Sequence, residues 1–172
     1  MTAFIRLVTA LSRLCGVLAA LMVLTSVLVV CQMVVTRYGL RASTTWQTEF
    51  VTYLLIAATL IGSPYVLLTR GHVNIDLIPL YLGHRGRLVL AVVSALIAFA
   101  FCLLLSWLGV AFWYEAWHEG WHSDTIWSVP LWIPYLALPV GFSVLSLQYL
   151  ADLLSLLAGH DMPFGIAPEK TL

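Results

Sequence analysis

Four long segments without a charged side chain limit what this chain can fold into. They cover residues 14–36, 50–69, 88–114 and 125–151. A helix of about 20 mostly apolar residues crosses a hydrocarbon core about 30 Å thick. Only 9% of the residues are charged, against about 25% in soluble domains. The sequence therefore predicts an all-α, polytopic membrane protein and excludes a soluble enzyme and a disordered chain. Nucleic acid is not expected as a partner, because eight Lys and Arg balance eight Asp and Glu.

We expect one membrane domain over residues 1–172 with four membrane-spanning helices. The predicted spans are about 14–36, 46–69, 88–114 and 131–157. The fourth begins late in its uncharged segment because Pro130, Pro134 and Pro139 crowd the first half. Proline is tolerated in the first turn of a helix but kinks the helix further in. A kink is therefore expected near Pro139.

The residues before the first span predict a short amphipathic helix. Phe4, Val8 and Leu11 share one helical face, whereas Arg6 and Arg13 lie elsewhere. Such a helix would lie on the membrane surface, the alternative being a frayed tail. The first span is longer than the apolar core of a cleaved signal peptide, which has about 7–15 residues, so we retain it as a span.

The distribution of Lys and Arg predicts the orientation in the membrane. Outside the spans, six of these residues lie on the side of the two termini and of the loop 70–87. Only Arg37 and Arg41 lie on the other side. Cytoplasmic loops carry the excess of Lys and Arg. Both termini are therefore expected in the cytoplasm, and the loop 115–128 is expected outside.

The second span begins with a polar motif. Thr44 and Gln47 have the spacing of a capping box, with Thr44 as the N-cap residue. Trp46, Glu49 and Tyr53 follow and share one helical face. The residues favour a capped helix with an interfacial Trp anchor. The alternative is that Glu49 contacts a partner protein at the membrane edge.

The segment that follows the second span predicts a structural loop. Gly71 can end the helix, and Arg70 suits the negative end of the helix dipole. His72 and Asp76 are close enough in sequence to hydrogen-bond across a turn. No nucleophile or metal-binding set is completed nearby, so we predict that the chain is not an enzyme.

The third loop combines Trp, His and acidic residues. His118 and His122 have a spacing that can chelate a metal, and haem is a second possibility. Gly120 interrupts the helix between them, and aromatic residues often form a belt at the membrane interface. A docking surface for an external protein fits these residues better. Its members would be Glu115, Trp117, Glu119, Trp121 and Asp124.

The span centres carry no ionisable side chain. Glu49 and Asp152 sit near span ends, and Gln32 and Gln148 are the long neutral polar residues in the spans. Transport paths through a membrane usually contain ionisable groups. We therefore expect this chain to pack against a larger partner and to form no solute pathway alone.

Several motifs together resemble the small membrane subunit of tripartite ATP-independent periplasmic (TRAP) transporters. The most specific is Gly-His-Val-x-Ile-Asp after a helix that begins Trp-x-x-Glu. The Pro-rich start of the fourth span supports it. The matching residues are Arg37–Tyr38, Trp46–Glu49, Gly62, Arg70–Asp76, Val129–Tyr135 and Pro139–Gly141.

The resemblance implies a secondary uptake system with three parts in the bacterial inner membrane and periplasm. A periplasmic binding protein would capture a carboxylate solute, and a large polytopic membrane subunit would carry it inward, with sodium bound in that subunit. This chain would hold no cofactor, contact membrane lipid and stabilise the large subunit. Six residues would be structural or inter-subunit contacts, namely Trp46, Glu49, Tyr53, Arg70, His72 and Asp76. The alternative is a haem- or metal-binding membrane anchor of a respiratory complex.

Overall fold

The computed structural model describes residues 2–69 and 84–157, and these ranges contain four helices long and apolar enough to cross a membrane. The first is α1 (Thr2–Val34), which continues as the π-helical turn η1 (Val35–Gly39). The second is α2 (Thr45–Leu68) and the third is α4 (His84–His118). The fourth consists of α5 (Trp132–Tyr135) and α6 (Ala137–Leu157). The prediction of an all-α protein with four spans is confirmed, whereas the single domain over 1–172 stays a prediction.

The N-terminal residues do not form a helix of their own. Residues 2–13, predicted as a separate amphipathic helix, are the first turns of α1. Neither glycine nor proline interrupts them, so nothing in the sequence breaks the helix there. Val8 and Ser12 are buried, whereas Leu7 is 70% exposed. Of the predicted apolar face only Val8 is buried, because Phe4 and Leu11 are exposed, so the face that packs inside the protein contains Val8 and Ser12 and differs from the predicted one.

The fourth span is broken at Leu136, between α5 and α6. Pro139 has no backbone N–H, so it cannot donate to the carbonyl of Tyr135, and its ring crowds that carbonyl. The backbone N–H of Leu136 still bonds the carbonyl of Trp132, and that of Val140 bonds the carbonyl of Leu136, both at 3.3 Å and four residues back as in an α-helix. The interruption of the fourth span therefore lies at Leu136, three residues before Pro139, and the helical bond that the proline cannot make is the one to the Tyr135 carbonyl.

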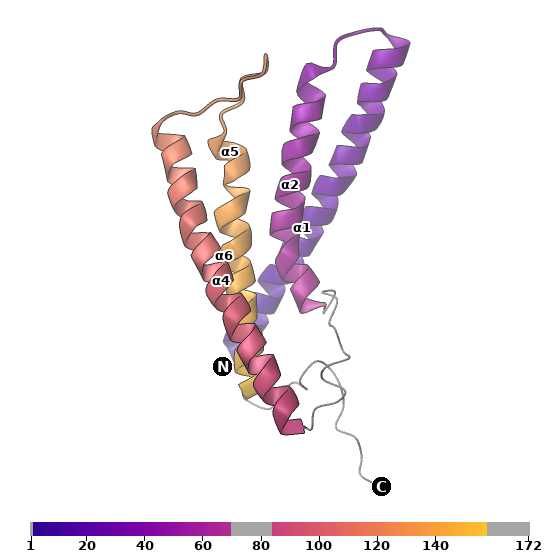
Figure 1. Cartoon of the computed structure of the whole chain (residues 1–172). Helices are drawn as coiled ribbons and strands as arrows, with labels where there is room; N and C mark the ends of the chain where they lie inside the picture. Colours follow the sequence, from indigo (N-terminus) through magenta and orange to yellow (C-terminus); the bar gives the residue numbers. More distant parts are fainter. Residues whose placement is uncertain (1, 70–83, 158–172) are drawn as a thin grey trace.

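The four spans pack as two pairs, α1 with α2 and α4 with α6, and α2 and α1 also contact α6. In Figure 1 the pairs lie close together near the N-terminus of the chain and diverge toward the other end. Small residues allow the close contacts. A Cβ atom on Gly141 of α6 would lie only 2.6 Å from the carbonyl oxygen of Leu60 in α2. These two helices therefore approach to backbone contact.

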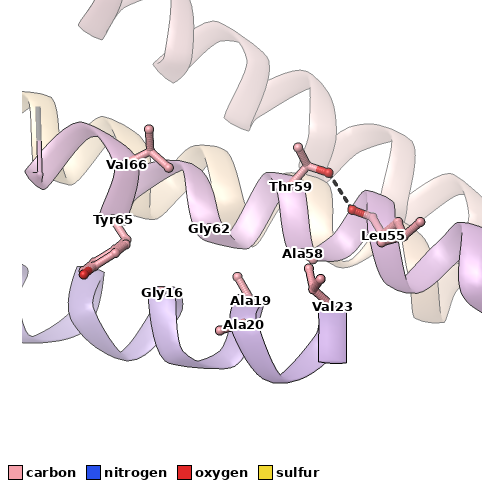
Figure 2. Close-up of a pocket in the computed structure, with 10 residues that line it drawn as sticks. All are labelled: Gly16, Ala19, Ala20, Val23, Leu55, Ala58, Thr59, Gly62, Tyr65 and Val66. Carbon is pink, nitrogen blue, oxygen red and sulfur yellow. Dashed lines mark hydrogen bonds between the residues drawn. The ribbon is translucent and has the colours of Figure 1, made fainter. Parts of the chain in front are cut away.

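Small side chains also line the contact between α1 and α2. Figure 2 shows a shallow groove there, with Gly16 and Ala19 of α1 facing Ala58 and Gly62 of α2. A Cβ atom on Gly16 would lie 2.4 Å from the ring of Tyr65. Small residues let helix backbones approach in a membrane, where van der Waals packing replaces the hydrophobic effect as the driving force.

Buried polar side chains connect the helices at two levels. Ser12 Oγ of α1 donates to Gln148 Oε1 of α6 at 2.7 Å, and Gln148 Nε2 donates to Asp152 Oδ1 at 2.8 Å. The hydroxyls of Ser106 in α4 and Ser143 in α6 lie 2.7 Å apart. Such bonds contribute on average about 0.6 kcal/mol each between membrane helices. They fix the register of α6 against both neighbours.

Candidate functional site

The loop 119–131 begins at a helix end that turns the chain back toward α2. Gly120 has a φ of +63°, in the left-handed region that favours glycine. The N–H of Trp121 bonds the carbonyl of Ala116 at 3.0 Å, and the N–H of Gly120 bonds that of Trp117 at 3.2 Å. This pair of bonds is the Schellman arrangement that ends many helices. Gly120 therefore ends α4 and separates His118 from His122, as predicted.

Backbone hydrogen bonds within the loop give it a compact shape. The N–H of Ser123 bonds the carbonyl of Val129 at 2.9 Å, and the N–H of Leu131 bonds the carbonyl of Trp121 at 2.9 Å. A third bond joins Ser128 N–H to the Thr125 carbonyl at 3.0 Å. The two limbs of the loop thus pair with each other before the chain enters α5.

Glu49 connects this loop to the first turns of α2. Its carboxylate accepts hydrogen bonds from the hydroxyls of Tyr53 (2.7 Å), Thr125 (2.5 Å) and Ser123. An ionised carboxylate only accepts hydrogen bonds and has room for about four, so it suits three converging O–H donors. Bonds to an ionised group are also about twice as strong as neutral ones. Glu49 is therefore the centre of the polar contact between α2 and the loop.

Three aromatic rings reinforce the same contact. Trp127 from the loop lies against Trp46 and Phe50 of α2, with ring centroids 5.9 and 6.2 Å apart. Trp46 and Phe50 are themselves 6.2 Å apart. Aromatic pairs in tilted and edge-to-face arrangements contribute about 0.5–1.5 kcal/mol beyond the area they bury. The loop is therefore held by a carboxylate on one side and by Trp127 on the other.

The structure brings together part of the predicted set at the start of α2. Glu49 and Tyr53 are bonded, and Trp46 joins the aromatic cluster. The predicted capping box is wrong. Thr44 occupies the N-cap position but its side chain makes no capping hydrogen bond. Gln47 is buried, and its Oε1 has no hydrogen-bond partner within residues 2–69 and 84–157. The Gln47 side chain points into the packed interior and does not reach back to Thr44.

The residues of the predicted docking surface differ in exposure. Glu115, Trp117, Glu119 and Asp124 are exposed. Trp121 is half-buried. Its ring packs on Phe112 with centroids 5.7 Å apart, and its indole N–H donates to Glu119 Oε2 at 3.3 Å. Trp121 therefore supports the base of the loop, while the others remain accessible.

The histidines of the same region do not gather ligands in the part of the chain that the structure describes. His118 packs on Tyr114, with ring centroids 6.0 Å apart, and His122 Nδ1 lies 2.5 Å from the carbonyl oxygen of Gly120. No group of three His, Cys, Asp or Glu side chains that could hold a metal occurs among those residues. The haem- or metal-anchor alternative gains no support from this geometry.

Sequence reasoning missed Ser123, Thr125 and Trp127, the loop side of the contact. The polar motif of α2 and the loop are 74 residues apart in the chain, and no local pattern connects them. The remaining predicted residues, Arg70, His72 and Asp76, lie outside the described residues.

Comparison with known families gives one match that covers most of the chain. The family model for the DctQ component of tripartite ATP-independent periplasmic transporters matches residues 26–159. This range includes α2, α4, α5, α6 and the loop held by Glu49. No curated protein matches the chain.

Proposed function

The chain belongs to the DctQ component family of tripartite ATP-independent periplasmic transporters and is a small subunit of such a system. We propose that it packs against a large transport subunit and stabilises that subunit. The observation that carries this proposal is the large apolar exterior of α1 and α4. Leu7 is 70% exposed, Ile97 65% and Trp107 76%. Within a membrane such faces can contact lipid or the helices of a partner.

The polar groups inside the spans support a packing role. Ser12 bonds Gln148, and Ser106 bonds Ser143, so these side chains join helices of this chain to one another. Glu49 lies in the first turns of α2 and is directed to the loop. A solute pathway would need polar groups that replace water around the solute. The substrate and sodium sites are therefore proposed to lie in the large subunit.

The transport chemistry that we propose is secondary, sodium-coupled uptake of a carboxylate solute across the inner membrane. It rests on the likeness to the TRAP family and on the placement of Lys and Arg. The excess of these residues beside the termini supports cytoplasmic ends. This orientation puts the loop 119–131 on the periplasmic side. A periplasmic binding protein is then the third part of the system.

The loop is proposed to help receive that binding protein. Glu115, Glu119 and Asp124 are exposed and near one end of the spans. Trp117 is 58% exposed in the same region. Exposed aromatic residues are common at the centres of protein interfaces, and surface charges speed the encounter of complementary partners.

Charge reversal tests this role. Uptake of the solute is measured in cells that carry the wild-type chain, no chain, or a chain with Glu115→Lys, Glu119→Lys and Asp124→Lys. We expect uptake to be lost without the chain and to fall about tenfold or more in the triple variant, because charge complementarity mainly sets the association rate. The triple variant should still co-purify with the large subunit. Unchanged uptake would remove the docking role, and uptake without the chain would remove the requirement for this subunit.

A further inference from the structure

The two helix pairs touch along α6 and separate near the loop 119–131. Among the helices, α6 makes most of the contacts between the α1–α2 pair and the α4–α6 pair. Ser12 of α1 donates to Gln148 of α6, and Gly141 of α6 lies against the backbone of Leu60 in α2. Toward the loop the pairs diverge (Figure 1). The backbone contact between the pairs therefore lies away from the loop.

Between this contact and the loop, α2 and the fourth span leave an open crevice. Its α2 wall runs from Ile61 to Phe50, and Val140 and Ile133 lie in the opposite wall. Val140 is 41% exposed and Ile133 is 52% exposed, so the two walls are not closely packed. The packing of side-chain ridges into grooves normally fixes the angle between two helices. Here that packing is incomplete, and the angle between the pairs depends on the contacts at the two ends of the crevice.

The loop closes the wide end of the crevice. Trp127 lines it and packs on Phe50, with ring centroids 6.2 Å apart. From the same loop, Ser123 and Thr125 donate to the carboxylate of Glu49. Because the loop connects α4 to α5, these contacts tie the α4–α6 pair to α2. We call Glu49, Ser123, Thr125 and Trp127 the latch.

The loop and the helices that carry it are joined into one body. The indole N–H of Trp113 in α4 donates to the carbonyl of Trp132 in α5 at 3.0 Å. A Cβ atom on Gly109 of α4 would lie 3.4 Å from the nitrogen of Pro139 in α6, so α4 packs tightly beside the break in the fourth span. A displacement of the loop is therefore carried to α4, α5 and α6 together.

We infer that the latch fixes the angle between the α1–α2 pair and the α4–α6 pair, with Gly141 and Leu60 as the pivot. While the latch is closed, the crevice keeps one width. When the latch opens, the two pairs rotate about the pivot. The distance from Leu60 to Glu49 along α2 is about 17 Å at about 1.5 Å per residue, so a rotation of about 10° moves the end of α2 by about 3 Å. The latch is thus a conformational device that couples the loop to the arrangement of the helices.

Distances between spin labels test this device in the full-length chain. The native cysteines Cys15, Cys31 and Cys102 are first replaced by alanine. Labels are then attached through Val34→Cys and Tyr114→Cys, two exposed positions near the loop end of the two pairs, and double electron–electron resonance gives the distribution of distances between them. The latch is opened by Glu49→Leu together with Trp127→Ala. We expect the mean distance or the width of the distribution to change by about 3 Å or more.

Two controls separate rotation about the pivot from general loosening. Labels at Leu7→Cys and Val89→Cys, which are exposed at the opposite end of the pairs, should keep their distance when the latch is opened. Glu115→Leu together with Trp107→Ala changes the same residue types at exposed positions outside the latch. This variant should leave both distance distributions unchanged.

A second variant opens the latch from the loop side. Ser123→Ala together with Thr125→Ala removes the two donors to Glu49 and serves if the first variant fails to fold; the same change in the distance between the labels at positions 34 and 114 is expected. If that distance stays the same although the loop amides exchange faster, the loop is released without moving the helices and the inference is overturned. An equal change between the labels at positions 7 and 89 would also overturn it, because the whole fold would then have loosened.

Discussion

Glu49→Leu is expected to release the loop 119–131 from α2. The substitution removes the acceptor for the hydroxyls of Ser123 and Thr125, and leucine offers these donors nothing in return. Hydrogen exchange of the loop amides measures the effect. The amides of Ser123, Ser128 and Leu131, which are bonded within the loop, should exchange about tenfold faster or more, because bonds to a charged acceptor are about twice as strong as neutral ones.

A glutamate-to-leucine substitution at an exposed position provides the control for Glu49→Leu. Glu115→Leu replaces an exposed carboxylate at the end of α4 and should leave loop exchange unchanged. Glu49→Gln keeps one carbonyl oxygen as acceptor and should give an intermediate rate. Unaltered exchange in Glu49→Leu would contradict the account and would leave Trp127 as the group that holds the loop.

Gly141→Ala is expected to destabilise the fold although alanine favours helices. The added Cβ would lie 2.6 Å from the carbonyl oxygen and 2.8 Å from the carbonyl carbon of Leu60. Backbone atoms cannot rotate away, so α2 and α6 must separate. Overpacking of this kind costs about 1–3 kcal/mol, which exceeds or offsets the gain of about 1 kcal/mol in helix propensity. Unfolding of the purified chain in detergent, followed by tryptophan fluorescence, measures the free energy of unfolding.

Gly39→Ala, the same type of substitution at a position with free space, is not expected to lower the free energy of unfolding. A Cβ at this position meets only Val35 Cγ1, at 4.0 Å, which is ordinary contact. The free energy of unfolding should stay the same or rise by about 0.4–1 kcal/mol, because alanine restricts the unfolded chain. If Gly141→Ala stabilised the protein as well, the close approach of α2 to α6 would not exist in the folded state.

The membrane-spanning helices could be predicted because a segment that crosses the membrane must be long, apolar and uncharged. Four uncharged segments of sufficient length gave four helices, since backbone groups in hydrocarbon must be bonded within the helix. The ends of the helices were harder to predict from the sequence. Hydropathy predicted an end near Tyr114, but α4 continues to His118 because Gly120 is the residue that stops it. The N-terminal pattern was interpreted as a surface helix, whereas Ser12 packs against Gln148.

The contact between Glu49 and the loop could not be derived from the sequence. The two alternatives were an interfacial anchor and a contact with a partner protein. In the structure the Glu49 carboxylate accepts hydrogen bonds from the hydroxyls of Ser123 and Thr125, which lie 74 and 76 residues further along the same chain. Which distant segments contact each other depends on how the helix pairs pack, and the hydrophobic periodicity of the sequence does not specify that contact. Small residues such as Gly141 allow close packing, but the sequence does not show which helix they face.

The most direct test of the central claim is the composition of the purified complex. The chain is tagged at its C-terminus and purified from its native membrane in mild detergent, and the proteins that accompany it are identified and quantified. We predict one large polytopic membrane protein in equal amount, because the apolar faces of α1 and α4 are proposed to pack against it. Recovery of the chain alone, or together with haem or a soluble dehydrogenase, would contradict the proposal that it stabilises a large transport subunit.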